Sequence, residues 1–133
     1  MKFRWSCDRD GCWNDKFRLR FDDMGMNAAL PGSRCFTDVD ALTNVDGSFL
    51  LQEWKDWAEP GPLSVGQDLL YRALTRTCPN IQVLAVLGST QAGSCHHVSR
   101  YEGGRQTKWK PYTLDQLNEW TRRWGLRAVA DRR

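Results

Sequence analysis

Residues 36–55 read Phe-Thr-Asp-Val-Asp-Ala-Leu-Thr-Asn-Val-Asp-Gly-Ser-Phe-Leu-Leu-Gln-Glu-Trp-Lys, and this stretch decides the fold. Two runs rich in strand-forming residues, 36–45 and 48–55, flank the dipeptide Asp46-Gly47. Asp-Gly between such runs is a strong hairpin signal, because a type I′ turn needs positive φ at both central positions. The stretch therefore predicts two antiparallel strands joined by a two-residue turn.

The two-residue turn also predicts which residues face one another. Counting outward from it, Asp40 faces Glu53 and Asp38 faces Lys55. Alternation along each strand puts all four side chains on one face of the sheet. Directly opposed residues have Cβ atoms about 4.5–5.5 Å apart. Three carboxylates and one ammonium group are therefore expected to converge on a small patch.

Carboxylates that lie this close repel each other unless a proton or a cation comes between them. Oxygen ligands favour Mg²⁺ or Mn²⁺ over zinc, and such an ion polarises phosphoryl oxygens and lowers the pKa of bound water. The pattern predicts a metal centre with Asp40 and Glu53 as ligands. Lys55 would orient the attacking water or offset charge on phosphorus. The alternative is an exposed strand face held by ion pairs such as Asp38–Lys55.

Turn and cap signals divide the rest of the chain. The expected elements are a helix opened by a capping box at residues 64–67 and ending near residue 77, an apolar strand over 81–87, a hairpin around Gly103-Gly104, and a final helix capped at residues 113–116. This order predicts an α/β fold with a mixed sheet, and 133 residues suit a single domain, 1–133. Residues 1–34 stay open between a strand at 16–21 and a helix within 11–30.

Charge is distributed unevenly along the chain. The net charge is +3, but residues 98–133 carry nine Lys or Arg against four Asp or Glu. Within this basic third, Arg105, Lys108 and Lys110 lie around Trp109, a mixture of cations and aromatics that is common in nucleic-acid grooves. The predicted role of this hairpin and helix is to contact the nucleic-acid backbone. A solvated charged face, with Trp109 in the core, is the alternative.

Composition favours a protein of the cytoplasm. Hydrophobic residues make up 41% and charged residues 26%, as in ordinary globular proteins. No apolar run approaches the roughly 20 residues that cross a bilayer, and the first residues lack the apolar stretch of a secretory signal. No membrane partner is expected.

The five cysteines, an odd number, argue against a disulfide framework. Cys7, Cys12, Cys35 and Cys95 with His96 could instead hold zinc, which would make the chain a zinc-stabilised interaction protein. The pair His96-His97 could act as a base or a ligand, although a structural role is the simpler interpretation.

Asp40 followed thirteen residues later by Glu53-Trp54-Lys55 resembles the PD-(D/E)XK nucleases, notably their small resolvase-like and phage-type members. Gln67-Asp68-Leu69-Leu70-Tyr71 is similar to the Gln-x-x-x-Tyr element of RecB-type and Cas4-type members. Gln67 and Tyr71 share a helix face, and Gln67 lies in the first turn, where N–H groups favour phosphate. Alternatively, Gln67 only completes the helix cap and Tyr71 only fills the core.

Two departures from the family pattern stand out. No proline precedes the first acid of the motif, and no Glu precedes Glu53 that could supply the further acid of many members. Asp15, Asp22 or Asp23 would have to serve instead. The resemblance covers residues 36–87.

The resemblance implies a restriction-endonuclease-like fold, a mixed sheet flanked by helices. It implies an Mg²⁺- or Mn²⁺-dependent nuclease of bacterial or phage-infected cytoplasm that hydrolyses phosphodiester bonds in DNA, or in RNA, with a homodimer left open. Asp40 and Glu53 would bind the metal, and Lys55 and Gln67 would join them in catalysis. Tyr71 would join Arg105, Lys108 and Lys110 in binding nucleic acid. A non-catalytic nucleic-acid-binding or inhibitory module on the same fold is the alternative.

Overall fold

The computed structural model describes residues 25–32, 34, 36–37 and 39–131. The chain divides into two compact units, Met1–Asp38 and Val39–Arg133. In the first unit, residues 25–30 form turns in which the N–H of Ala29 donates to the carbonyl of Gly25 at 3.0 Å. The turn expected at Pro31-Gly32 is present, with φ of 68° at Gly32. The strand or helix considered before residue 25, and the acids Asp15, Asp22, Asp23 and Asp38, lie outside the described residues.

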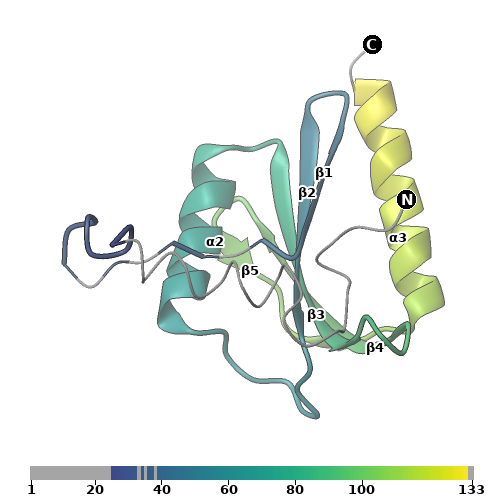
Figure 1. The fold of residues 1–133 in the computed structure, drawn as a ribbon. Helices are drawn as coiled ribbons and strands as arrows, with labels where there is room; N and C mark the ends of the chain where they lie inside the picture. The colour runs from purple at the N-terminus through teal and green to yellow at the C-terminus, as the bar shows by residue number, and fades with distance from the viewer. Residues whose placement is uncertain (1–24, 33, 35, 38, 132–133) are drawn as a thin grey trace. The chain divides into compact units, whose positions relative to one another are not determined.

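The second unit is a mixed α/β fold, in which a six-stranded sheet lies between two helices (Figure 1). Its elements are β1 (Ala41–Val45), β2 (Ser48–Lys55), α2 (Val65–Thr77), β3 (Ile81–Ser89), β4 (Ser94–Glu102), β5 (Arg105–Gln106), β6 (Lys110–Pro111) and α3 (Leu114–Asp131). The strand order is β1-β2-β3-β4-β5, and β6 also pairs with β4. Strands β2 and β3 are parallel and connected through α2, whereas the other pairs are antiparallel.

The hairpin β1–β2 confirms the predicted turn and register. Val45 pairs with Ser48, and φ is 51° at Asp46 and 90° at Gly47. The first strand is shorter than expected, since it begins at Ala41 and not at residue 36. Just before β1, a carboxylate oxygen of Asp40 accepts the backbone N–H of Trp54. This hydrogen bond takes the place of the next backbone hydrogen bond between the two strands.

The two helix caps also form as predicted. The hydroxyl of Ser64 accepts the N–H of Gln67 at 3.3 Å at the start of α2. At α3, Thr113 and Gln116 exchange backbone-to-side-chain hydrogen bonds of 2.9 and 3.2 Å, the reciprocal pattern of a capping box. No helix in the described part of the chain is long and apolar enough to span a membrane.

Each face of the sheet carries its own apolar cluster, because successive strand residues point to opposite faces. We call these the α2 face and the α3 face after the helix that covers each (Figure 1). The α2 face holds Leu51, Leu63, Tyr71, Val83, Ala85 and Tyr101. The α3 face holds Leu50, Leu84, Val86, Val98, Leu117 and Trp124. Helix α3 contributes Leu117 and Trp124 to this second cluster, and Trp120 packs against it.

Strand β4 is longer than the sequence pattern indicates, and the short β6 is an additional strand. The turn at Gly103-Gly104 is confirmed, since Glu102 pairs with Arg105. However, β4 reaches back to Ser94 through a polar stretch, and its register with β3 shifts between Leu87 and Gly88. This polar strand is held in place by its pairing with the buried β3. Its own sequence therefore shows no alternation of apolar and polar residues that would predict a strand.

Candidate active site

Glu53 is the centre of the polar cluster on the α2 face. Its side chain is almost fully buried, with 5% of the residue exposed. Oε1 accepts from Gln67 Nε2 at 2.9 Å and lies 3.0 Å from Lys55 Nζ, while Oε2 accepts from Tyr71 Oη at 3.0 Å. A buried carboxylate needs donors to its oxygens. These three contacts hold the Glu53 carboxylate in one orientation.

The side chains around Glu53 come from two elements, β2 and α2, which a loop separates in the sequence. Lys55 follows Glu53 by two residues on β2, so both side chains point to the α2 face. Gln67 and Tyr71 lie one turn apart on α2 and point toward β2. The backbone N–H of Gln67 donates to the Ser64 cap, and its side-chain oxygen accepts from the Ser64 hydroxyl at 3.4 Å, while its side-chain amide donates to Glu53. The contacts with the cap and with the acid thus coexist in one residue.

Asp40 lies beside this cluster. It directly precedes β1, whose first residue pairs with Gln52, and its Oδ2 accepts the N–H of Trp54 at 2.7 Å. Burial is the largest cause that raises the pKa of Tyr71. The negative charges of Glu53 and, more weakly, Asp40 raise this pKa further. The tyrosine hydroxyl consequently stays protonated and acts as a donor to Glu53.

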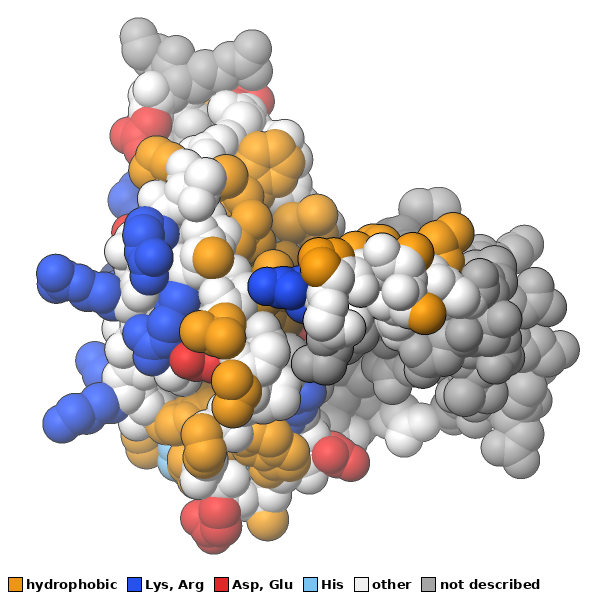
Figure 2. Space-filling model, turned by 90° about the vertical axis from the view of Figure 1, so that its left-hand side faces the viewer, with side chains coloured by type: hydrophobic (Ala, Val, Ile, Leu, Met, Phe, Trp, Pro, Cys, Tyr) orange, Lys and Arg blue, Asp and Glu red, His pale blue; other side chains and the backbone are white. Residues whose placement is uncertain are grey.

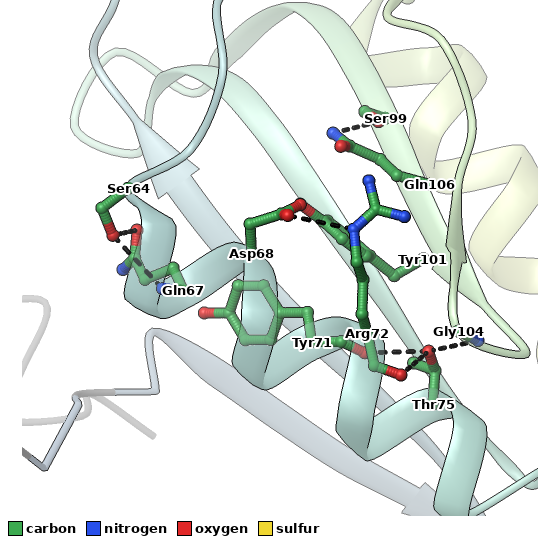
Figure 3. Close-up of polar contacts among 10 residues, drawn as sticks. All are labelled: Ser64, Gln67, Asp68, Tyr71, Arg72, Thr75, Ser99, Tyr101, Gly104 and Gln106. Carbon is green, nitrogen blue, oxygen red and sulfur yellow. Dashed lines mark hydrogen bonds and ion pairs between the residues drawn. The ribbon is translucent and has the colours of Figure 1, made fainter. Parts of the chain in front are cut away.

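A second polar network, which the sequence analysis did not predict, supports Tyr71 from the side of β4 (Figure 3). The ring of Tyr101 contacts that of Tyr71 edge-on, with centroids 5.5 Å apart. Its hydroxyl donates to Asp68 Oδ1 at 2.7 Å, and Arg72 Nε donates to Asp68 Oδ2 at 3.0 Å. The hydrogen bond from Tyr101, and then Arg72, lower the pKa of Asp68 against the opposing effect of burial.

The spacing of Asp68 and Arg72, four residues apart on a helix, signals their ion pair in the sequence. Nothing local indicates Tyr101, because it reaches Asp68 only when β4 pairs with β3. Burial, followed by the bond to Asp68, raises the pKa of the Tyr101 hydroxyl.

The oxygen donors at this site suit a hard divalent cation. Glu53 is on β2 and Asp40 lies just before β1, and Mg²⁺ is commonly held by one or two carboxylates plus water and substrate phosphate. Oε1 of Glu53 already has two protein donors, whereas Oε2 has one, so Oε2 retains more capacity for a cation. The described residues contain no group of three or more His, Cys, Asp or Glu arranged to hold a metal.

The predicted nucleic-acid residues do not all lie on the face of Glu53. Lys110 pairs with Val98, which packs on the α3 face, and Arg105 pairs with Glu102, which contacts Arg100. Lys108 is exposed between β5 and β6. Trp109 packs against the cluster on the α2 face and donates to the carbonyl of Gly61 at 3.0 Å, so it is a core residue.

Cations also lie on the outer side of the α2 face, where Figure 2 shows Lys and Arg side chains gathered along one side and apolar side chains beside them. Helix α2 contributes Arg72 and Arg76, which the sequence analysis did not single out. Gly104, at the β4–β5 turn, packs against Arg76.

The two histidines sit at the bulge of β4. His96 Nε2 lies 3.1 Å from the carbonyl of Trp57, and its Nδ1 lies 2.8 Å from Nδ1 of His97. A carbonyl only accepts, so Nε2 of His96 carries the proton; in the neutral pair, His97 then donates from Nδ1. His96 therefore has a structural role, and His97 keeps a basic lone pair at Nε2. The zinc hypothesis depends on Cys7, Cys12 and Cys35, which lie outside the described residues.

In comparisons with known proteins, no protein-family model, no curated protein and no solved structure significantly matches the chain.

Proposed function

We propose that the chain is a metal-dependent phosphodiesterase of the restriction-endonuclease-like type that cuts DNA. The observation that supports this most is the convergence of Lys55, Gln67 and Tyr71 on the buried carboxylate of Glu53, with Asp40 bound to the backbone of the next residue, Trp54. Local motifs alone do not require these side chains to meet.

Each residue has a role that follows from its position. Asp40 and Glu53 would hold Mg²⁺ or Mn²⁺, which supplies Lewis-acid polarisation of a phosphoryl oxygen and a more acidic water. Gln67 and Tyr71 hold the Glu53 carboxylate in one orientation, which is the preorganisation that catalysis by charge requires. Lys55 is partly exposed, with 24% of its side chain accessible. Its ammonium can therefore reach a phosphate oxygen as well as Glu53.

The same cluster also supports the rival function, a non-catalytic nucleic-acid-binding or inhibitory module. Glu53 already has three protein donors, and a carboxylate satisfied in this way can simply be a structural element of the core. The two functions differ in whether a divalent cation competes for Glu53 and whether phosphodiester bonds are cut.

The deciding experiment incubates the full chain with labelled duplex, single-stranded and branched DNA, and with RNA, in Mg²⁺, Mn²⁺ or EDTA. We expect cleavage that needs a divalent cation and is abolished in Glu53→Gln. Glu59→Gln is a matched control, because this exposed glutamate lies in the loop before α2. Binding without cleavage under every condition would favour the module. Cleavage that persists in EDTA or in Glu53→Gln would exclude the assigned centre.

A further inference from the structure

A second polar cavity lies on the α3 face, on the opposite side of the sheet from Glu53. Its volume is about 90 Å³. The polar side chains at its wall are Arg100 from β4, Thr107, and Lys110 from β6. Leu84, Leu117 and Trp120 supply apolar wall. Two cations and a hydroxyl thus line a cavity that is otherwise hydrophobic.

Arg100 has hydrogen-bonding capacity that the described protein does not use. Its Nε is buried without a hydrogen-bond partner among the described residues, and Nη2 lies 3.5 Å from Glu102 Oε2. A guanidinium group carries five N–H donors in a planar fork that matches the oxygens of a phosphate. Nε is shielded from the cavity by its burial, so an oxyanion bound at the head of Arg100 would use the Nη donors of the guanidinium group.

Thr107 is held in a suitable orientation by the backbone. Its Oγ1 accepts the N–H of Arg100 at 2.9 Å, which leaves the hydroxyl hydrogen available for an acceptor in the cavity. Lys110 is exposed at the rim, opposite Val98 in the ladder, where its ammonium can add a second positive charge. Arg100, Thr107 and Lys110 therefore present donors to one space.

We propose that this cavity binds the phosphate group of a nucleotide or oligonucleotide. The cavity has room for a tetrahedral oxyanion but is too small for a whole nucleotide. A wider groove of about 370 Å³ adjoins it, lined by Tyr112, Gln116 and Trp120 among others, and can receive the sugar and base. Tyr112 and Trp120 line both spaces, so the groove lies directly beside the phosphate cavity.

No acidic residue lines the phosphate cavity among the described residues. Glu102 lies 3.5 Å from Arg100 Nη2 with half of its side chain exposed. In the wider groove, Glu119 is bound by Arg122 and Arg123 at 2.7–3.0 Å, and Asp115 lines the groove from the first turn of α3. Because the sheet separates this cavity from Glu53, the phosphate bound here is not the one proposed to be cut.

The test is isothermal titration of the full chain in EDTA, which excludes metal-dependent cleavage. The probes are inorganic phosphate, deoxyadenosine 5′-monophosphate, deoxyadenosine, and a dinucleotide whose only phosphate is internal. We expect the phosphate-bearing probes to bind and deoxyadenosine not to bind. Binding of the monophosphate would identify a free nucleotide as the source, and binding of the dinucleotide alone would identify the nucleic-acid backbone.

Variants locate the site. Arg100→Gln and Lys110→Gln should each weaken binding about tenfold or more, since each removes a charged hydrogen-bond donor. Arg127→Gln removes the same charge from an exposed position elsewhere on α3 and should leave binding unchanged. In ¹⁵N spectra, the amides of Arg100 and Thr107 should shift on titration. If Arg100→Gln fails to fold, the exposed Lys110→Gln decides.

Two results would overturn the proposal. One is the lack of saturable binding of every phosphate probe in the millimolar range. The other is binding that Lys110→Gln leaves unchanged or that Lys55→Ala abolishes, which would place the phosphate beside Lys55 at the Glu53 cluster. Because no probe is cleaved, failure here is independent of whether the chain is a nuclease.

Discussion

The hydroxyl oxygen of Tyr71 lies 3.0 Å from Oε2 of Glu53, and both residues are buried, with 1% and 5% of their surface exposed. The tyrosine comes from α2 and the glutamate from β2. A buried carboxylate oxygen needs a donor, so this contact both attaches the helix to the sheet and orients the carboxylate. The stability of the fold and the geometry of the proposed site are therefore linked.

Tyr71→Phe should test this link. It leaves Oε2 of Glu53 without its donor, and we expect a loss of about 1–3 kcal/mol in the free energy of unfolding. Urea denaturation measures it. Tyr112→Phe is the matched control, since Tyr112 packs on the α3 face, away from Glu53. Equal stability of Tyr71→Phe and the parent would mean that the hydrogen bond contributes little.

Asp40→Asn and Lys55→Ala should fail in different ways. Asn keeps an acceptor for the N–H of Trp54 but loses the charge, so Mn²⁺ binding and cleavage should disappear together. Lys55→Ala should retain Mn²⁺, or bind it more tightly, because a nearby positive charge is gone. Its turnover should fall about 10²–10³-fold. Calorimetry with Mn²⁺ beside a cleavage assay separates the two, and parental cleavage by either variant contradicts the assignment.

The buried tyrosines predict instability in alkali. Burial is the main cause that raises the pKa of Tyr71 and of Tyr101 above the usual value of about 10. The sign follows from linkage: the unfolded chain loses these protons first, so stability is full below about pH 10 and falls as pH rises further. Each tyrosine should contribute a slope of up to about 1.4 kcal/mol per pH unit.

Urea denaturation measured at several alkaline pH values gives the slope of stability against pH. Tyr101→Phe should make this slope shallower by the contribution of one tyrosine. The Phe variant and the parent having the same alkaline slope would show that Tyr101 ionises equally in both states.

Gly88→Ala should disrupt the β3–β4 bulge. A Cβ at Gly88 would clash with the carbonyl of Ser94 and lie 2.6 Å from Cα of Cys95, both backbone atoms that cannot move aside. We expect destabilisation of about 1–3 kcal/mol. Gly66→Ala is the control, because nothing lies within 4 Å of its Cβ; in α2 it should stabilise by about 0.4–1 kcal/mol. A neutral Gly88→Ala would mean that the strands separate easily here.

DNA binding should depend on salt if the basic third of the chain contacts the backbone. Each phosphate contact contributes a slope of roughly −0.9 in log K against log salt for duplex DNA. Replacing Arg105 and Lys108 with Ala should reduce both affinity and slope, measured by fluorescence anisotropy. Unchanged values would exclude this surface and direct attention to Arg72 and Arg76 on α2.

The hairpin, the helix caps and the apolar side of α3 were predictable because each depends on neighbours in the chain. Asp46-Gly47 meets the positive-φ requirement of its turn, and this turn sets the register that brings Asp40 toward Glu53. The early end of β1 was not predictable, since a side chain, Asp40, replaces a ladder hydrogen bond. The full length of the polar β4 was not predictable for a related reason: it is a strand because it pairs with β3, and this pairing depends on the tertiary structure.

What the sequence determined by itself is the pair of strands that present Asp40, Glu53 and Lys55, and a helix that carries Gln67 and Tyr71 on one side. The tertiary structure decided that this helix crosses from β2 to the parallel β3 and lies on the face of Glu53. It also decided that Arg100 and Lys110 lie on the other face. Turn and cap geometry are local, whereas the choice of face depends on burying two apolar clusters at once, to which residues from the whole unit contribute.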